Sequence, residues 1–326
     1  MGAFAQIYSP LEIVFVDDAS TDNGFEIAQR IAAQYQGPHR IVVTRYGRHG
    51  GVGEQWERVL TESRGEIMVY ADTDDISLPD RCQRIYEAFR DGGPELLGVD
   101  SYCDLIDARG APITGVPPHI ALNRFSSEHL TAEMLARNRN SPLGAVLAVR
   151  RIVFEVGVPL ASLRRVDDSA LAFRCLVLGR MKTIPEVLVL RRSHLDNVSA
   201  AIDVSWSGKT LGAWFSKHLD DLTPVPAVMR QDLDKFARDG LISAARAHQL
   251  RREVDLYAHE VELQRLAQRM PWWRWRRWTL YFALRRLGIG RRPAIRLALL
   301  ATAPALAIMF LRRNPVHRAA RQAAAG

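Results

Sequence analysis

Residues 11–22 of the chain read LEIVFVDDASTD, an apolar run that ends in acids. The run Leu11–Val16 follows a Ser-Pro pair and is rich in β-branched residues, which is typical of a buried parallel strand. Asp17 and Asp18 come directly after it, and Ser20 follows two residues later. We therefore expect a strand whose carboxyl end is acidic.

A second strand with an acidic end follows further along the chain. Residues 66–75 read EIMVYADTDD, in which the run Glu66–Ala71 leads into Asp72, Asp74 and Asp75. In an open α/β sheet, the carboxyl ends of parallel strands meet at one edge, where ligands bind. We therefore expect the acids of both strands to converge at that edge.

Helical patterns separate the predicted strands. We expect further strands at 40–44, 145–149 and 186–191, and helices at 23–35, 54–63, 78–90, 128–137, 168–179 and 229–270, the last being one long helix or a helix pair. This alternation predicts an α/β fold with a mainly parallel sheet flanked by helices, and a helical C-terminal extension.

The acids at the two strand ends need a counter-charge. Five carboxylates at one sheet edge repel one another unless something cationic neutralises them. A hard divalent cation takes oxygen ligands of this kind, so the pattern predicts a metal site. The alternative is a set of solvated turn acids, with Asp22 capping the next helix.

Composition places the chain among folded proteins with a sizeable core. Of its 326 residues, 48% are hydrophobic and 25% are charged. Cys82, Cys103 and Cys175 lie far apart, which excludes a C-x-x-C pair and favours reduced thiols over a disulfide framework. The first ten residues do not resemble a secretory signal. We therefore expect a cytoplasmic protein.

The net charge of +8 comes from the C-terminal part of the chain. Residues 227–326 carry 20 Lys and Arg against 7 Asp and Glu, and the 14 arginines after Glu262 are accompanied by no acid. Such asymmetry predicts a polyanionic partner for the tail, either anionic lipid or nucleic acid.

The tail sequence favours lipid. Residues 271–278 read PWWRWRRW, and tryptophan with arginine suits the headgroup region of a bilayer. The apolar run Leu297–Leu311 is shorter than the about 20 residues that a span needs, and Pro304 interrupts it. We therefore expect residues 271–313 to lie on the inner face of the cell membrane by shallow or re-entrant insertion. Packing of the tail on the folded domain is the alternative, and the apolar run disfavours nucleic acid.

The order of these segments resembles the inverting family 2 glycosyltransferases of GT-A fold. That family runs through a strand, Asp-Asp-x-Ser-x-Asp, a helix, a glycine-containing loop, a helix, Arg-Gly-Glu, a strand and Asp-x-Asp-Asp, and later has a Glu-Asp pair and an Arg-x-His-x-x-x-x-Ser segment. The matching segments here are Leu11–Asp22, Gly50–Asp75 with Arg64-Gly65-Glu66, Val166-Asp167-Asp168, Arg192-Ser193-His194 and Asn197-Val198-Ser199.

The resemblance implies a catalytic domain and its substrates. It implies a GT-A-like domain at residues 1–205, followed by a helical linker region at 206–270 and basic, aromatic membrane-associating helices at 271–326. The substrates would be a nucleotide-sugar donor and the hydroxyl of a saccharide or lipid-linked acceptor.

The resemblance also implies which residues bind the donor. Asp17 and Asp18, together with Ser20, would hold the nucleobase and ribose. Arg192 would contact the diphosphate oxygens, as guanidinium groups do elsewhere.

Metal and proton chemistry would fall to the later acids. By the resemblance, Asp72 and Asp74 bind ribose and a Mn²⁺ or Mg²⁺ ion, with His194 as a further ligand, and the ion stabilises charge on the departing diphosphate. Asp168 would be the general base that deprotonates the acceptor hydroxyl, with Asp167 raising its pKa. A plain helix-capping role for both is the alternative.

The sequence departs from the family in three places. Met1–Pro10 resembles the end of the helix after the family's first strand, so we expect that strand to be missing here. Gln55-Trp56-Glu57 stands where the family carries Ala-Arg-Asn, and Asp167-Asp168 replaces Glu-Asp. These differences concern the donor site and the base more than the fold.

Three other functions are alternatives to a glycosyltransferase. A sugar nucleotidyltransferase needs an opening glycine-rich phosphate loop, whereas the glycine-rich segment 47–51 lies elsewhere. An aspartate-nucleophile phosphatase would use Asp72 and Asp74, but Ile76 replaces its usual Thr or Val. The third is a non-catalytic membrane scaffold that retains the fold, which metal-dependent donor binding or hydrolysis distinguishes from an enzyme.

Overall fold

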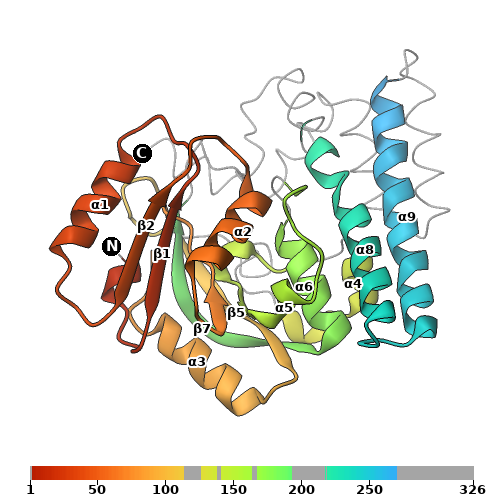
Figure 1. The fold of residues 1–326 in the computed structure, drawn as a ribbon, viewed down its shortest axis with the longest axis horizontal. Helices are drawn as coiled ribbons and strands as arrows, with labels where there is room; N and C mark the ends of the chain where they lie inside the picture. Colours follow the sequence, from red (N-terminus) through yellow and green to blue (C-terminus); the bar gives the residue numbers. More distant parts are fainter. Residues whose placement is uncertain are drawn as a thin grey trace.

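The computed structural model describes residues 2–113, 126–137, 141–163, 167–192, 217 and 219–269 (Figure 1). His194 and the tail 271–326 lie outside these residues, so the predictions made for them stay predictions. Within the described ranges, no helix combines the length and the apolar character that crossing a bilayer requires.

Strands and helices alternate along the described chain. The strands are β1 (Glu12–Asp17), β2 (Arg40–Arg45), β3 (Ile67–Val69), β4 (Ile76–Ser77), β5 (Leu96–Ile106), β6 (Ala148–Arg150) and β7 (Arg180–Arg192). The α-helices are α1 (Gly24–Gln34), α2 (Val52–Glu62), α3 (Arg81–Gly92), α4 (Ala132–Ala136), α5 (Ile152–Glu155), α6 (Asp167–Leu178), α8 (Val225–Arg238) and α9 (Ala244–Arg269). Short 3₁₀ turns are η1 (Gly2–Ala5), η3 (Ser127–His129) and η4 (Gly144–Val146).

The strands form two sheets. β1 and β2 pair in parallel, and a five-stranded sheet has the order β3-β6-β5-β7-β4. In the larger sheet β5 and β7 are parallel, whereas the other three pairs are antiparallel. The predicted α/β class is confirmed, but the sheet is mixed rather than mainly parallel.

The strand β1 is less buried than its sequence predicts. Residues Glu12–Val16 are half-buried, and Asp17 alone in this strand is buried. Among the described residues, β1 pairs with β2 only, and no residue of α1 is buried. An apolar run is fully buried only where both faces and both edges are covered, and this small sheet lacks that cover.

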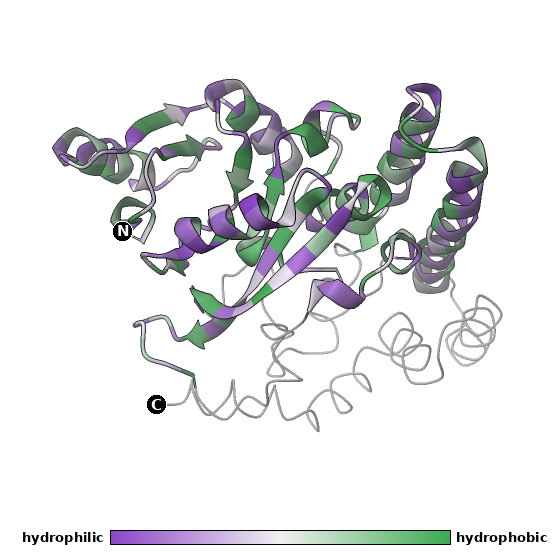
Figure 2. Cartoon of the chain, turned by 90° about the horizontal axis from the view of Figure 1, so that it is seen from below, coloured by the Kyte–Doolittle hydropathy of each residue, from purple (hydrophilic) through white to green (hydrophobic). Residues whose placement is uncertain are grey.

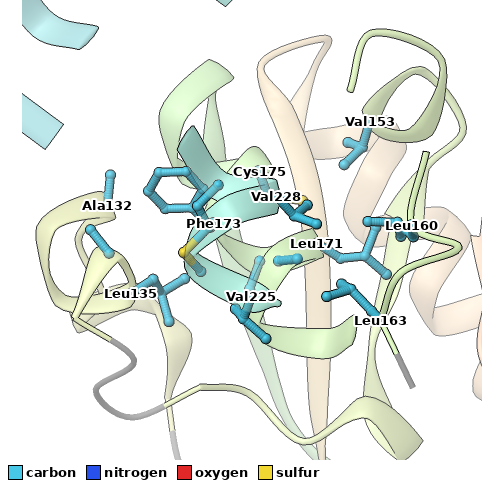
Figure 3. Close-up of a cluster of buried hydrophobic side chains, with 14 of the residues drawn as sticks. Ala132, Leu135, Val153, Leu160, Leu163, Leu171, Phe173, Cys175, Val225 and Val228 are labelled. Atoms are coloured by element: carbon cyan, nitrogen blue, oxygen red, sulfur yellow. The ribbon is translucent and has the colours of Figure 1, made fainter. Parts of the chain in front are cut away.

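Helices cover both faces of the larger sheet (Figure 1). On one face, Ile85 and Phe89 of α3 pack against β5, β6 and β7. On the other, α6 contributes Leu171 and Phe173 to a larger core that includes residues of α2, α4, α8 and α9 (Figure 3). Neighbouring residues of the strands alternate between the two cores, as Ala148 and Val149 of β6 do.

The central strand β5 was not expected from the sequence. It reads LLGVDSYCDLI, so polar residues interrupt its apolar pattern. The carboxylate of Asp100 is nevertheless buried, because the hydroxyls of Ser127 and Thr183 donate to its Oδ1 at 3.0 and 2.6 Å. Burial raises the pKa of Asp100 to about 7 against these two hydrogen bonds. Polar residues in a core strand are tolerated where each finds a partner.

The pair α8 and α9 belongs to the same core as the sheet. Leu250, Val254, Tyr257 and Val261 recur at helical spacing on α9 and are buried, although most of this helix is hydrophilic (Figure 2). The expected long helix or helix pair is therefore a helix pair, and it packs on α4 and α6.

A fully buried ion pair ties α8 to α6. Arg174 Nε lies 2.7 Å from Asp232 Oδ2, and both side chains are 0% exposed. The main-chain N–H of Val158 donates to Asp232 at 2.8 Å, and Arg174 donates back to the carbonyl of Val158. Gly157 leaves space for the guanidinium, because a Cβ there would lie 2.2 Å from Arg174 Cζ.

Breaking this pair on one side should destabilise the protein strongly. The variant Asp232→Leu leaves a buried guanidinium without its carboxylate, which costs about 3–5 kcal/mol of unfolding free energy, whereas replacing both partners by apolar residues of similar size is close to neutral. We expect the double variant Arg174→Met, Asp232→Leu to be the more stable of the two in urea denaturation. The exposed pair Arg90–Asp91 is the control, and Asp91→Ala should leave the midpoint unchanged. Equal stabilities of the single and double variants would contradict this role.

Candidate active site

The turn between β3 and β4 carries a cluster of three carboxylates. Asp72, Asp74 and Asp75 each place an oxygen within 4.8 Å of the others. The turn closes with a hydrogen bond of 3.3 Å from the N–H of Asp75 to the carbonyl of Asp72. Oxygen atoms from three acids at this spacing match the ligand set of a hard divalent cation.

The cluster is electrostatically unfavourable as it stands. Burial raises the pKa of Asp72 despite a hydrogen bond with Tyr70, and Asp74 raises it further. Burial also raises the pKa of Asp75 to about 6, against a hydrogen bond from the N–H of Arg192. Among the residues that the structure describes, none hydrogen-bonds the buried Oδ2 of Asp75. These residues fit a divalent cation, which would satisfy the orphaned oxygen and offset the repulsion.

The first acidic strand does not contribute to this cluster. The prediction placed Asp17 and Asp18 beside the later acids, but the described acids close enough to share an ion are those of the turn 72–75. Among the described residues, Asp17 and Asp18 therefore do not join this ion site, and their approach to the later acids stays a prediction. β1 and β3 belong to different sheets.

Asp18 instead holds the glycine-rich loop before α2. Its carboxylate accepts the main-chain N–H groups of Gly50 and Gly51, each at 2.9 Å. Arg58 Nη1 lies 2.8 Å from Oδ1, and His49 Nδ1 lies 2.8 Å from Oδ2. Burial alone would raise the pKa of Asp18, but these donors hold it below its ordinary value. Four donors from residues 49–58 thus fix this loop against the end of β1.

Asp17 holds the turn that follows β1. Its Oδ2 accepts the N–H of Ser20 at 3.2 Å and the Nε–H of Arg45 at 2.9 Å, and Arg45 also donates to the carbonyl of Ser20. These bonds hold the pKa of Asp17 below its ordinary value in spite of burial. Ala19 in this turn has a φ of 61°, a conformation that non-glycine residues rarely adopt. The predicted donor-binding residues of this segment therefore form a tightly bonded turn.

Asp168 lies in the first turn of α6, beside a small enclosed hollow. The hollow is lined by Asp168, Trp56, Tyr70, Gly144 and apolar residues of β3, β6 and α6. Asp168 Oδ1 accepts the N–H of Ser169 at 2.7 Å. Tyr70 connects this hollow to the acidic turn, because it stacks near Trp56 at 5.2 Å and hydrogen-bonds Asp72. The side chain of Asp167 and all of His194 lie outside the described residues.

Arg192 lies beside the acidic turn, and its guanidinium binds protein carbonyls. Its Nε–H donates to the carbonyl of Asp74 at 2.9 Å, and its Nη1–H groups reach the carbonyls of Asp107 and Ala108, each at 3.0 Å. Its main-chain N–H donates to Asp75 Oδ1 at 2.7 Å. The diphosphate contact expected for Arg192 stays a prediction.

Sequence reasoning overlooked three participants of the site. Asp75 belongs to the quoted Asp-x-Asp-Asp segment, yet only Asp72 and Asp74 were expected to bind metal. Arg58, one turn along α2 from Glu54, and Tyr70, the residue after β3, carried no motif that marked them. Alternation along β3 gave the one available signal for Tyr70, because it lies on the same face as the buried Met68.

Comparison with known proteins agrees with this geometry. The sequence model of Glycosyl transferase family 2 matches residues 2–135. An uncharacterized glycosyltransferase of Nostoc is 30% identical over 195 residues, and the chain spans 58% of that relative's length while the match covers 58% of the chain. The glycosyltransferase GlyG of Streptococcus pneumoniae is 24% identical over 226 residues, which cover 66% of this chain and 72% of GlyG.

A solved structure shows the same fold. Residues 1–349 of TarS from Staphylococcus aureus match with a TM-score of 0.50 and 16% identity, over 98% of this chain and 86% of that one. At this identity the likeness concerns the fold alone, and it confirms the GT-A type arrangement expected from the sequence. With the family match over the acidic turn and two relatives of the same kind, residues 2–135 of the chain are similar to glycosyltransferase family 2.

Proposed function

We propose that this protein transfers a sugar from a nucleotide-diphosphate donor to a hydroxyl group of a saccharide or lipid-linked acceptor, with inversion at the sugar. The single observation that carries the proposal is the cluster of Asp72, Asp74 and Asp75 at the end of β3. The similarity of residues 2–135 to Glycosyl transferase family 2 and to a glycosyltransferase of Nostoc supports the same reaction class.

The cluster is the proposed place of the metal. Asp72, Asp74 and Asp75 would hold Mn²⁺ or Mg²⁺, and His194 remains a proposed further ligand from outside the described residues. When bound, such an ion stabilises the negative charge that develops on diphosphate oxygens. The role of the chain is to keep three oxygens close together, at a site where Asp75 is already partly buried and incompletely bonded.

The donor's nucleoside would lie near the carboxyl end of β1. We propose that Asp17, Asp18 and Ser20 shape this part of the site chiefly by fixing two segments, the turn 17–20 and the loop 47–51. A preformed loop binds a ligand with less loss of conformational entropy than a flexible one. Both oxygens of Asp18 and the Oδ2 of Asp17 already accept bonds within the protein, and direct contact of these carboxylates with the nucleobase or ribose stays a prediction.

Asp168 is the proposed general base. It is half-buried at the start of α6 and lines a hollow together with Tyr70, which hydrogen-bonds Asp72 of the acidic turn. The base would accept the proton of the acceptor hydroxyl as that oxygen attacks the sugar. The neighbouring carboxylate of Asp167 would favour the protonated form by like-charge repulsion.

Nucleotide binding should depend on the metal and on Asp74. We expect one nucleoside diphosphate from a panel to raise the melting temperature only with Mn²⁺, because a ligand at about 100 times its Kd stabilises a fold by about 2.7 kcal/mol. The rise should disappear in Asp74→Asn and persist in Asp91→Asn, an exposed carboxylate on α3. A folded chain that responds to no nucleotide would instead support the non-catalytic scaffold, and a response to nucleoside triphosphates alone would support a nucleotidyltransferase.

Loss of the base should affect turnover and spare binding. The variant Asp168→Asn should release nucleoside diphosphate from the selected donor about 10²–10⁴ times more slowly, since general-base catalysis contributes that much. Its Mn²⁺-dependent thermal shift should match the wild type. If Asp168→Asn released nucleoside diphosphate at a rate within a factor of two of the wild type, Asp168 would be a helix cap and not the general base.

Membrane association is proposed for the tail on sequence grounds alone. Full-length protein should co-sediment with vesicles that contain anionic phosphatidylglycerol and should not co-sediment with phosphatidylcholine alone. Replacing Arg274, Arg276 and Arg277 by Gln should weaken binding by about 1 kcal/mol per residue.

Three exposed arginines of the folded part provide the matched control for that experiment. The same substitution at Arg30, Arg64 and Arg109 removes equal charge and should leave vesicle binding unchanged. If both triple variants lost vesicle binding equally, the net charge of the protein would govern binding, and the tail would provide no specific membrane surface.

A further inference from the structure

Strand register brings Arg192 to the junction of two turns. β4 and β7 are antiparallel, with Ile76 opposite Leu190, so the residues before Ile76 run beside those after Leu190. β5 and β7 are parallel, with Ile106 opposite Arg192. The end of β7 therefore lies between the acidic turn 72–75 and the turn that follows β5.

Arg192 binds both turns at once. Towards the acidic turn, its Nε–H donates to the carbonyl of Asp74 and its main-chain N–H to the carboxylate of Asp75. Towards the other turn, Nη1 donates to the carbonyls of Asp107 and Ala108. One residue thus bridges two segments that are more than thirty positions apart in sequence.

The turn 107–111 is a firm anchor. Asp107 Oδ1 accepts the N–H groups of Arg109 and Ala111, each at 2.8 Å, and the main-chain N–H of Asp107 donates to the carbonyl of Ala111 at 2.8 Å. Gly110 has a φ of 89°, which this tight reversal requires and which other residues rarely adopt. The carbonyls that receive Arg192 are therefore held in place by the turn itself.

The acidic turn is closed by a longer main-chain bond than the turn 107–111. Its own closing bond, from Asp75 to Asp72, is long at 3.3 Å, and its three carboxylates repel one another. We propose that Arg192 is a positioning residue, whose guanidinium fixes the backbone at Asp74 and so sets the spacing with which the three carboxylates meet a divalent cation. This inference rests on the proposed metal site. The planar fork of arginine suits such a multi-carbonyl contact, and a lysine ammonium does not reproduce it.

The test measures Mn²⁺ affinity without any nucleotide. The electron paramagnetic resonance signal of free Mn²⁺ is followed as full-length protein is added, for the wild type, Arg192→Met and Arg192→Lys. We expect both variants to bind Mn²⁺ about 10-fold more weakly, the lower end of what loss of an outer-shell partner costs a metal site. Because Arg192→Lys retains the positive charge, weaker Mn²⁺ binding by this variant would show that the planar geometry of the guanidinium matters.

The control removes the same charge from the same corner of the fold. Arg109 is exposed on the turn 107–111, and Arg109→Met should bind Mn²⁺ as the wild type does. Near-ultraviolet circular dichroism monitors the fold of each variant. If Arg192→Met does not fold, the Mn²⁺ affinity of Arg192→Lys alone tests the proposal.

Two results would overturn the proposal, and they differ from failure of the proposed function. Wild-type Mn²⁺ affinity in both Arg192 variants would show that the guanidinium does not set the metal geometry. The same affinity combined with weaker binding of nucleoside diphosphate would make Arg192 a donor ligand, as the family resemblance implies. Wild-type protein that binds no Mn²⁺ would instead remove the metal site itself.

Discussion

Repulsion among Asp72, Asp74 and Asp75 is the constraint on which this end of the fold depends. Three acids in one short turn are stable only where the surrounding chain supplies donors and positive charge. Arg192 supplies donors from β7. Arg81, fully buried at the start of α3, bonds Ser77 and the carbonyl of Ala145, and its charge attracts the acids of the turn. A bound cation would offset the repulsion among these three carboxylates.

The position of the proposed base depends on the helical C-terminal region. Asp168 begins α6, and the buried pair of Arg174 and Asp232 ties the same helix to α8. Because α8 and α9 share the hydrophobic core of the sheet, they act as a support for the catalytic face and form no independent unit in this structure. A change in these helices would reach the site through α6, without any contact between them and a substrate.

Sequence reasoning located the chemistry more reliably than the topology. Strand ends rich in acids predicted the turn 72–75, because side-chain type and spacing are local properties. The central strand β5 escaped notice, since Asp100 and Ser101 interrupt its apolar pattern and their partners lie far away in sequence. Whether Asp18 approaches the later acids depends on which strands pair, and periodicity along one strand carries no information about its neighbours. The bonds of Arg192 to two turns likewise depend on contacts that only the register reveals.

The central claim is that the acidic turn is the metal-binding part of a nucleotide-sugar site. The most direct measurement is anomalous X-ray diffraction at the manganese edge, on crystals grown with Mn²⁺ and the nucleoside diphosphate that stabilises the protein. The account predicts one strong peak about 2–2.5 Å from oxygens of Asp72, Asp74 or Asp75, with diphosphate oxygens completing its ligands. Nucleotide bound at the carboxyl end of β1 with no manganese at the turn would contradict it.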